Sequence, residues 1–253
     1  MNNRYVIKFS KNGYVKYTSH LDLLRMFKRI FKCSNLGLSY SQGFNPHPKM
    51  SFAQPLSLGY SSDCELIEFE LTSPCEPAEI ISRMQPKMPE GIMLLKCSKL
   101  PDEIKSLAAD ADSAYYKIWI PTEMSEDELK KALDGYLSQG EIVTLKRQKK
   151  TKKLAPVNIK SKIRECKVSK LGEFALIETT LDCGSASNCS PELVIASFCE
   201  FAGIQTPRHE MEVERKSAVL LIRIFDLILR KDVAHTDQNH TEKSLAPVLT
   251  VNY

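Results

Sequence analysis

No pair of the eight cysteines has CxxC spacing, and none belongs to a CxxxCxxC triplet, an arrangement that holds a cysteine-ligated iron–sulfur cluster. The N-terminus also lacks an apolar signal segment, and no run approaches the roughly 20 uncharged apolar residues of a membrane span. We therefore expect a soluble, cytoplasmic protein with no membrane association, whose thiols are mostly buried and reduced rather than paired in disulfides.

Positive charge is concentrated in two segments, although the net charge of the chain is only +4. Residues 1–50 contain nine Lys and Arg against the single acid Asp22, and residues 146–170 contain eleven against the single acid Glu165. The stretches between and after these segments carry more acids than bases. A polyanion can bind such segregated charge, so nucleic acid is a candidate ligand.

Residues 4–98 have the hydropathy pattern of a βαββαβ unit. Apolar and polar residues alternate over 5–9, as in a half-buried strand. Ser19 and Asp22 have the spacing of a capping box, and the apolar stripe after them predicts a helix. Further strands are expected at 66–71 and 92–95, with a short helix from Pro77 between them. The second strand would begin at 38–40.

The same order is expected after an acidic linker at residues 100–112. It comprises a strand at 115–120, a helix capped by Ser125 and Glu128, strands at 142–145 and 174–180, and a helix from Pro191 that ends at Gly203. Periodicity does not decide between strand and helix for residues 218–230.

We therefore predict the α+β class, with two tandem ferredoxin-like βαββαβ units whose antiparallel sheets are covered by helices. The length of 253 residues suits two compact domains. The predicted domains are residues 1–99 and 113–230, and residues 231–253 are expected to form a mobile tail.

The segment LSYSQGFNPHPKMSFAQPLSLG, residues 38–59, is too long and too rich in small and rigid residues for a plain connection. Gly43 permits unusual backbone angles, and Phe44 and Phe52 could stack on unpaired bases. In the alternative interpretation, both rings fill the core and the prolines only shape a turn.

The basic run that begins at residue 146 is expected to form an exposed loop or ribbon that contacts phosphates. A solvated loop and an acidic protein partner are the alternatives. We expect this ribbon and the 38–59 segment to converge on one RNA. The predicted RNA-binding residues are Arg25, Lys28, Arg29, Gln42, Phe44, Asn45, His47, Lys49, Lys146, Arg147, Lys149, Lys150, Lys152 and Lys153.

His20 and His47 allow a second interpretation, in which they act as general acid and general base on an RNA phosphodiester. His20 could instead bond a nearby backbone group, and Asp22 already has a capping role. The spacing of these residues does not indicate a metal site, so no metal is predicted.

Residues 4–32, RYVIKFSKNGYVKYTSHLDLLRMFKRIFK, together with residues 38–59 resemble the radical-SAM-linked family of uncharacterised bacterial proteins, a domain fused to or encoded beside a radical SAM protein. The resemblance is close through about residue 72, extends to residues 155–168, and is absent after about residue 210. The family's motif positions in this sequence are Ser19, His20, Asp22, Arg25, Gln42, Gly43, Phe44, Asn45, His47, Lys49 and Ser51.

The resemblance implies a partnership rather than a reaction. The iron–sulfur cluster and S-adenosylmethionine are expected on the radical SAM partner, with no cofactor on this chain. The expected function is that of an RNA-binding accessory protein that presents a tRNA or rRNA to this enzyme and has no activity of its own. A metal-independent ribonuclease or RNA-modifying enzyme using His20 and His47 is the alternative. A third possibility is a docking subunit whose acidic segments contact the enzyme.

Overall fold

The computed structural model describes residues 3–102, 104, 106–109, 111–148, 151–184 and 187–218. Two sequence predictions lie outside these residues: the choice between strand and helix for 218–230, except for Ala218 at the end of a described strand, and the tail at 231–253. Lys149 and Lys150 of the predicted RNA-binding set also lie outside them.

The N-terminal half, residues 3–99, forms three long strands, one short strand and two α-helices. Its elements are β1 (Arg4–Lys11), η1 (Gly13–Tyr17), α1 (His20–Cys33), β2 (Met50–Phe52), β3 (Ser61–Glu70), α2 (Pro77–Met84), η2 (Gln85–Lys87) and β4 (Ile92–Lys99). β1 lies between β4 and β3, and β2 pairs with the other edge of β3, all antiparallel. The second strand therefore begins at Met50 rather than at 38–40, where Leu38 and Tyr40 make only isolated bridges.

The C-terminal half, residues 111–218, has a similar order of elements with a ribbon inserted. Its elements are β5 (Ser113–Pro121), α3 (Glu126–Ser138), β6 (Val143–Arg147), β7 (Leu154–Asn158), η3 (Lys160–Lys162), β8 (Ile163–Leu171), β9 (Phe174–Asp182), α4 (Pro191–Ala202), η4 (Arg208–Glu210) and β10 (Glu212–Ala218). The strand predicted at 142–145 is outside the main sheet, because β6 and β7 pair only with each other in a two-stranded ribbon. Its place beside β9 is taken by β8.

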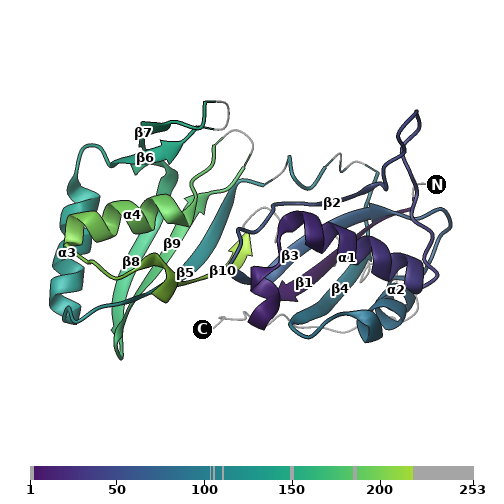
Figure 1. The fold of residues 1–253 in the computed structure, drawn as a ribbon, viewed down its shortest axis with the longest axis horizontal. Coiled ribbons are helices and arrows are strands. Elements are labelled where there is room, and N and C mark those ends of the chain that lie inside the picture. Colours follow the sequence, from purple (N-terminus) through teal and green to yellow (C-terminus); the bar gives the residue numbers. More distant parts are fainter. Residues whose placement is uncertain are drawn as a thin grey trace, which may run out of the picture.

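β10 joins both halves into one eight-stranded sheet, because it runs antiparallel to β5 and parallel to β3 (Figure 1). Parallel pairing is limited to Ser61 and Ser62 of β3 with Glu214 and Arg215 of β10. The α+β class with a largely antiparallel sheet is thus confirmed. The predicted pair of separate sheets is thus replaced by one sheet that the two halves share.

The described helices α1 to α4 cover one face of this sheet. Ile67 of β3 belongs to the core that α1 and α2 bury, and Val213 of β10 belongs to the core that α3 and α4 bury. Glu65 and Arg215 lie two residues along from these positions, so they share those faces, since side chains alternate along a strand. Because Glu65 and Arg215 form an ion pair, both helix layers lie on the same side.

The helix ends match their predicted caps. The Ser19 hydroxyl accepts a hydrogen bond from the Asp22 amide at 3.2 Å, which is one of the two bonds of the predicted capping box, and it donates to the Asp22 carboxylate instead of forming the second. Ser125 and Glu128 form both bonds of a capping box. Gly203 ends α4 with a φ of 71°, a left-handed conformation that glycine adopts without strain. Local sequence thus determines where these helices begin and end.

The described residues of the segment predicted as an acidic linker, 100–112, include parts that are packed into the fold. Leu100 and Leu107 are buried in a cluster with Val6 and Leu66. The side chains of Val6 and Leu66 project from the face of the N-terminal strands that no described helix covers. The Leu107 amide donates a hydrogen bond to Glu68. This segment therefore covers part of that face.

Candidate nucleic-acid interface

Residues 39–49 form a small hairpin that is tied at its base to β3. The Ser39 amide donates to the Glu70 carbonyl and the Lys49 amide donates to the Ser39 carbonyl, both at 2.8 Å. Further out, the Ser41 amide donates to the His47 carbonyl at 2.8 Å, and the Ser41 hydroxyl accepts from the His47 amide at 3.0 Å. These bonds hold the two arms together, so the hairpin presents its tip, residues 42–46, in a defined position.

Every residue of this tip is exposed. Phe44 has a relative exposure of 112%, and Gly43 beside it has a φ of 123°, which an L side chain rarely adopts. Gln42 and Asn45 add amide donors and acceptors next to the ring. The tip thus offers an aromatic face and hydrogen-bonding groups, the combination that grips unpaired bases.

Phe52, the second ring considered for base stacking, has a different environment. It is 6% exposed and packs against Phe9 and Phe27, with ring centroids 5.8 and 5.7 Å away. The base-stacking hypothesis is therefore wrong for Phe52, whose ring fills the N-terminal core because it closes the space between β1 and α1.

The outer face of α1 carries three cations predicted for RNA contact, Arg25, Lys28 and Arg29, and a fourth, Lys32. All four are exposed. Arg25 is ion-paired with Asp22 at 2.8 Å, and on the hairpin Lys49 is paired with Glu70 at 3.0 Å. Within the described part of the chain no ion pair is formed by Lys28, Arg29 or Lys32. These three cations are therefore the best placed to contact phosphates.

A pocket of about 440 Å³ lies between the C-terminal half of α1 and the segment that leads into the hairpin. Lys28 and Lys32 line one side and Tyr40 lines the other, with the Lys28 ammonium 5.7 Å from the Tyr40 ring centroid. Lys32, Asn35 and Tyr40 are not among the binding residues predicted from the sequence, although the i,i+4 spacing of Lys28 and Lys32 places both on one side of a helix.

The described contacts do not bring His20 and His47 together. His20 begins α1, with its ring 5.3 Å from Phe52, and burial followed by the nearby Lys11 ammonium lowers the pKa of its imidazole. His47 lies in the hairpin, next to Pro48, which pairs with Tyr40. Tyr40 contacts Lys28, so the hairpin meets α1 at Lys28. Lys28 follows His20 by eight residues, which is about 12 Å along the helix.

Two further motif residues have structural partners. The hydrogen bond between Asp22 and the Ser19 hydroxyl, reinforced by Arg25, lowers the pKa of the Asp22 carboxyl. The Ser51 hydroxyl donates to Glu68 at 2.9 Å, across the pairing of β2 with β3. Both contacts explain the residue types without a ligand.

The β6–β7 ribbon carries the second set of predicted cations, of which Lys146, Arg147, Lys152 and Lys153 are described and exposed. The ribbon packs on α4 through β6, where Thr144 is buried. It belongs to the C-terminal half, whereas the 39–49 hairpin pairs with β3 of the N-terminal half (Figure 1). The expected convergence of these surfaces in one groove is not found among the described residues.

The remainder of the 146–170 segment is not an exposed ribbon. Lys160 donates to the Leu137 carbonyl and Lys170 to the Thr122 carbonyl, while Arg164 forms ion pairs with Asp112 and Asp182. Because these three cations have partners within the fold, they are less available to a polyanion than the exposed cations of the ribbon are.

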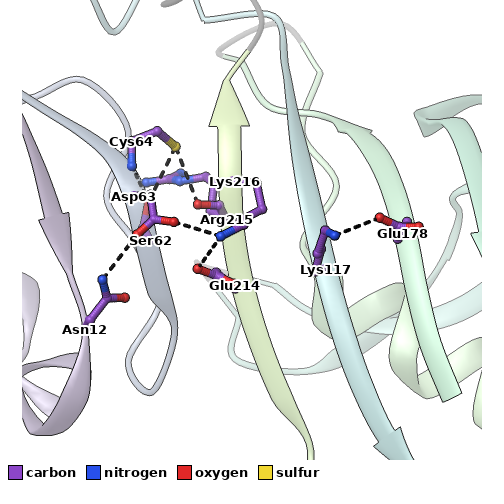
Figure 2. Close-up of polar contacts among 9 residues, drawn as sticks. All are labelled: Asn12, Ser62, Asp63, Cys64, Lys117, Glu178, Glu214, Arg215 and Lys216. Atoms are coloured by element: carbon purple, nitrogen blue, oxygen red, sulfur yellow. Dashed lines mark hydrogen bonds and ion pairs between the residues drawn. The ribbon is translucent and has the colours of Figure 1, made fainter. Parts of the chain in front are cut away.

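A second polar cavity, of about 680 Å³, lies on the helix-free face of β5, β8, β9 and β10. Two of its three lysines are paired with acids: Lys117 lies 3.1 Å from Glu178, and Lys216 lies 2.7 and 2.9 Å from Asp63 and Glu214 (Figure 2). Positive and negative charges are thus nearly balanced there, so this cavity attracts a polyanion less than the face of α1.

Among the described residues, no helix combines the length and the apolar composition needed to cross a membrane. Nor do these residues contain three or more His, Cys, Asp or Glu side chains placed to share a metal ion. All eight cysteines are free thiols, and five of them are buried: Cys64, Cys97, Cys183, Cys189 and Cys199.

A family model described as "Uncharacterized protein conserved in bacteria (DUF2344)" matches residues 4–191, and the chain therefore belongs to this family. No curated protein matches the chain. The matched segment includes α1, the 39–49 hairpin and the β6–β7 ribbon.

Two solved structures show limited likeness to this chain. A chain from the "Crystal Structure of a Cbf5-Nop10-Gar1 Complex" is 13% identical with a TM-score of 0.48, over 85% of this chain and 48% of that one. This chain thus spans about half of that one. The "Crystal Structure of an Unknown Protein from Galdieria sulphuraria" is 8% identical with a TM-score of 0.25, over 85% of this chain and 98% of that one. Both TM-scores are too low to indicate a function.

Proposed function

We propose that this member of a conserved bacterial family binds RNA through α1 and the 39–49 hairpin. The observation that carries the proposal is the exposed ring of Phe44, held at the tip of a hydrogen-bonded hairpin whose base, at Tyr40, lies against Lys28 on the cationic face of α1. Burying a phenylalanine side chain is favourable by about 1.5–3 kcal/mol, which a stacked base would supply on binding.

The charges around the hairpin support a polyanion as the ligand. Lys28, Arg29 and Lys32 follow one another on the outer side of α1, and no described acid pairs with them. Such cations bind phosphates without reading sequence, while Gln42 and Asn45 at the tip offer hydrogen bonds to base edges. Single-stranded or looped RNA fits this combination better than a regular duplex, whose bases are stacked and paired.

The β6–β7 ribbon is proposed as a second phosphate contact through Lys146, Arg147, Lys152 and Lys153, together with Lys149 and Lys150. Because the ribbon and the hairpin belong to different halves, a short oligonucleotide would occupy one surface at a time. A folded RNA such as a tRNA or a segment of rRNA could contact both.

Two further proposals rest on sequence and topology. The words SHLDL and SQGFNPHPKMSFA support a radical SAM enzyme as the partner that receives the RNA and supplies the cluster and S-adenosylmethionine. The strand orders β4-β1-β3-β2 and β10-β5-β9-β8 support a ferredoxin-like unit in each half, since this fold has its four strands in the order 4-1-3-2. No described contact favours a reaction by His20 and His47, which stays a prediction.

Fluorescence anisotropy with labelled bulk tRNA and with a single-stranded RNA tests the proposed function. We expect binding at low ionic strength that weakens steeply with added salt. The variant Lys28→Glu/Arg29→Glu should lose most of the affinity. The control Lys130→Glu/Lys131→Glu changes the same charge on α3 and should bind as the wild type does. Absence of RNA binding at low salt would refute the proposal.

A further inference from the structure

The pocket beside α1 has an apolar floor. Phe31 is fully buried, and Leu36 and Leu38 are 5% and 9% exposed. The side chain of Tyr40 stands at the rim and keeps 43% of its surface exposed. A flat apolar group that enters the pocket would thus contact the floor and the tyrosine ring together.

The polar groups of the pocket are two ammonium groups and an amide. Lys28 and Lys32 stand one helical turn apart on the same side of α1, and the described residues that line the pocket include no acidic side chain. Asn35 also lines it and has a φ of 52°, a left-handed conformation that asparagine tolerates better than most residues. Its amide offers both a donor and an acceptor.

These groups match the parts of a nucleotide. A base needs an apolar or aromatic surface with a few hydrogen-bonding groups at its edge, and a phosphate needs cations. The volume of about 440 Å³ falls within the usual range of small-molecule sites, about 300–1,000 Å³. A bare phosphate would leave the apolar floor unused, and an apolar ligand would leave the two ammonium groups unpaired.

We propose that this pocket binds a single unpaired nucleotide of the RNA, with its base against Tyr40 and the apolar floor and its phosphate between Lys28 and Lys32. This inference rests on the proposed RNA-binding function and makes it more specific. A base inside a regular duplex cannot reach the floor, whereas a bulged, looped or terminal base can leave the stack at low cost. The pocket thereby selects an irregular site in a folded RNA.

The test compares a blunt RNA duplex with the same duplex carrying one bulged nucleotide, both measured by anisotropy. The wild type should bind the bulged duplex about tenfold more tightly, as expected for one stacked base. The variants Tyr40→Ala and Lys32→Glu should lose this preference, so that each variant binds the bulged duplex and the blunt duplex with the same affinity. Lys131→Glu, on the exposed side of α3, is the matched control and should keep the tenfold preference.

Two outcomes separate this inference from the general function. If the protein binds RNA but shows no preference for the bulge, or if Tyr40→Ala keeps the preference, the pocket assignment is overturned and RNA binding stands. A titration with AMP and with adenosine, followed by NMR, decides the case in which no RNA binds. Shifts of the Lys28 and Tyr40 resonances with AMP, larger than those with adenosine, would support a nucleotide site, and no shifts would overturn it.

Discussion

The guanidinium of Arg215 in β10 donates to both carboxylate oxygens of Glu65 in β3, at 2.6 and 2.7 Å. It also donates to the carbonyl of Gln54 at 2.8 Å, and both charged side chains are less than 5% exposed. The pair lies where β3 and β10 run parallel, the place at which the two halves share one sheet. It therefore helps to fix the α1 surface relative to the β6–β7 ribbon.

Removal of one partner should destabilise the junction strongly. Glu65→Ala leaves a buried guanidinium without its counter-charge, and such a change costs about 3–5 kcal/mol of unfolding free energy. Equilibrium denaturation in urea measures this loss. The double variant Glu65→Leu/Arg215→Met, which removes both charges and retains volume, should recover most of the stability. Near-equal stability of Glu65→Ala and the wild type would contradict the assigned role.

A second contact between the halves should make stability depend on pH in the acid range. Glu192 of α4 accepts hydrogen bonds from the Tyr60 hydroxyl at 2.8 Å and from Arg208 at 2.6 and 2.8 Å. Burial alone would raise the pKa of this carboxyl, but the bonds from Arg208 and Tyr60 outweigh it and hold the pKa below its ordinary value of 4.5.

The sign of this effect follows from proton linkage. Below pH 4.5 the unfolded chain takes up a proton on Glu192 before the folded protein does, so the stabilisation present above that pH is lost as the pH falls. In thermal melts, the melting temperature should fall less between neutral and acid pH for Glu192→Gln than for the wild type. Identical pH profiles would show that the contact does not contribute. Glu126→Gln, on the exposed side of α3, serves as the control.

Local chemistry in the sequence predicted the helices well, because their caps are local. Ser19, Ser125 and Gly203 mark helix ends through bonds to residues only a few positions away. The exposure of the four cations of α1 was also predictable, since a stripe pattern assigns each position of a helix to a side. Sequence could not distinguish Phe52 from Phe44, because its burial depends on the distant Phe9 and Phe27.

The tertiary features that sequence reasoning missed depend on long-range pairing. Residues 143–147 have a strand pattern, but nothing in that pattern says whether the partner is β9 or β7. The joining of β3 to β10 brings together residues more than 150 positions apart, and Glu65 and Arg215 carry no local sign of it. Residues 100–112 look like a linker because only Leu100 and Leu107 reveal that the segment is packed.

Phe44→Ala should weaken RNA binding without a change in stability. Base stacking on an aromatic side chain contributes about 1–3 kcal/mol, so we expect a loss of roughly 5- to 150-fold in affinity for single-stranded RNA. Because Phe44 is fully exposed, the urea midpoint should stay that of the wild type. Tyr14→Ala is the matched control, since Tyr14 is 94% exposed. It lies in η1, before the N-terminal end of α1, whereas the hairpin contacts the C-terminal half of that helix. Equal losses in both variants would point away from a specific role of the hairpin tip.

The β6–β7 ribbon should contribute to the salt dependence of binding to a folded RNA. Removing one cation that binds a phosphate lowers the slope of log affinity against log salt by about 0.7–0.9. Lys152→Gln/Lys153→Gln should therefore lower the slope for tRNA by about 1.4–1.8, since both side chains are exposed at the end of the ribbon. The same change should leave the slope for a short single strand bound at the 39–49 hairpin unaltered, because the two surfaces belong to different halves. The pair Lys130→Gln/Lys131→Gln on α3 removes equal charge and should change neither slope. If both pairs lower the tRNA slope equally, net charge rather than binding by the ribbon explains the attraction.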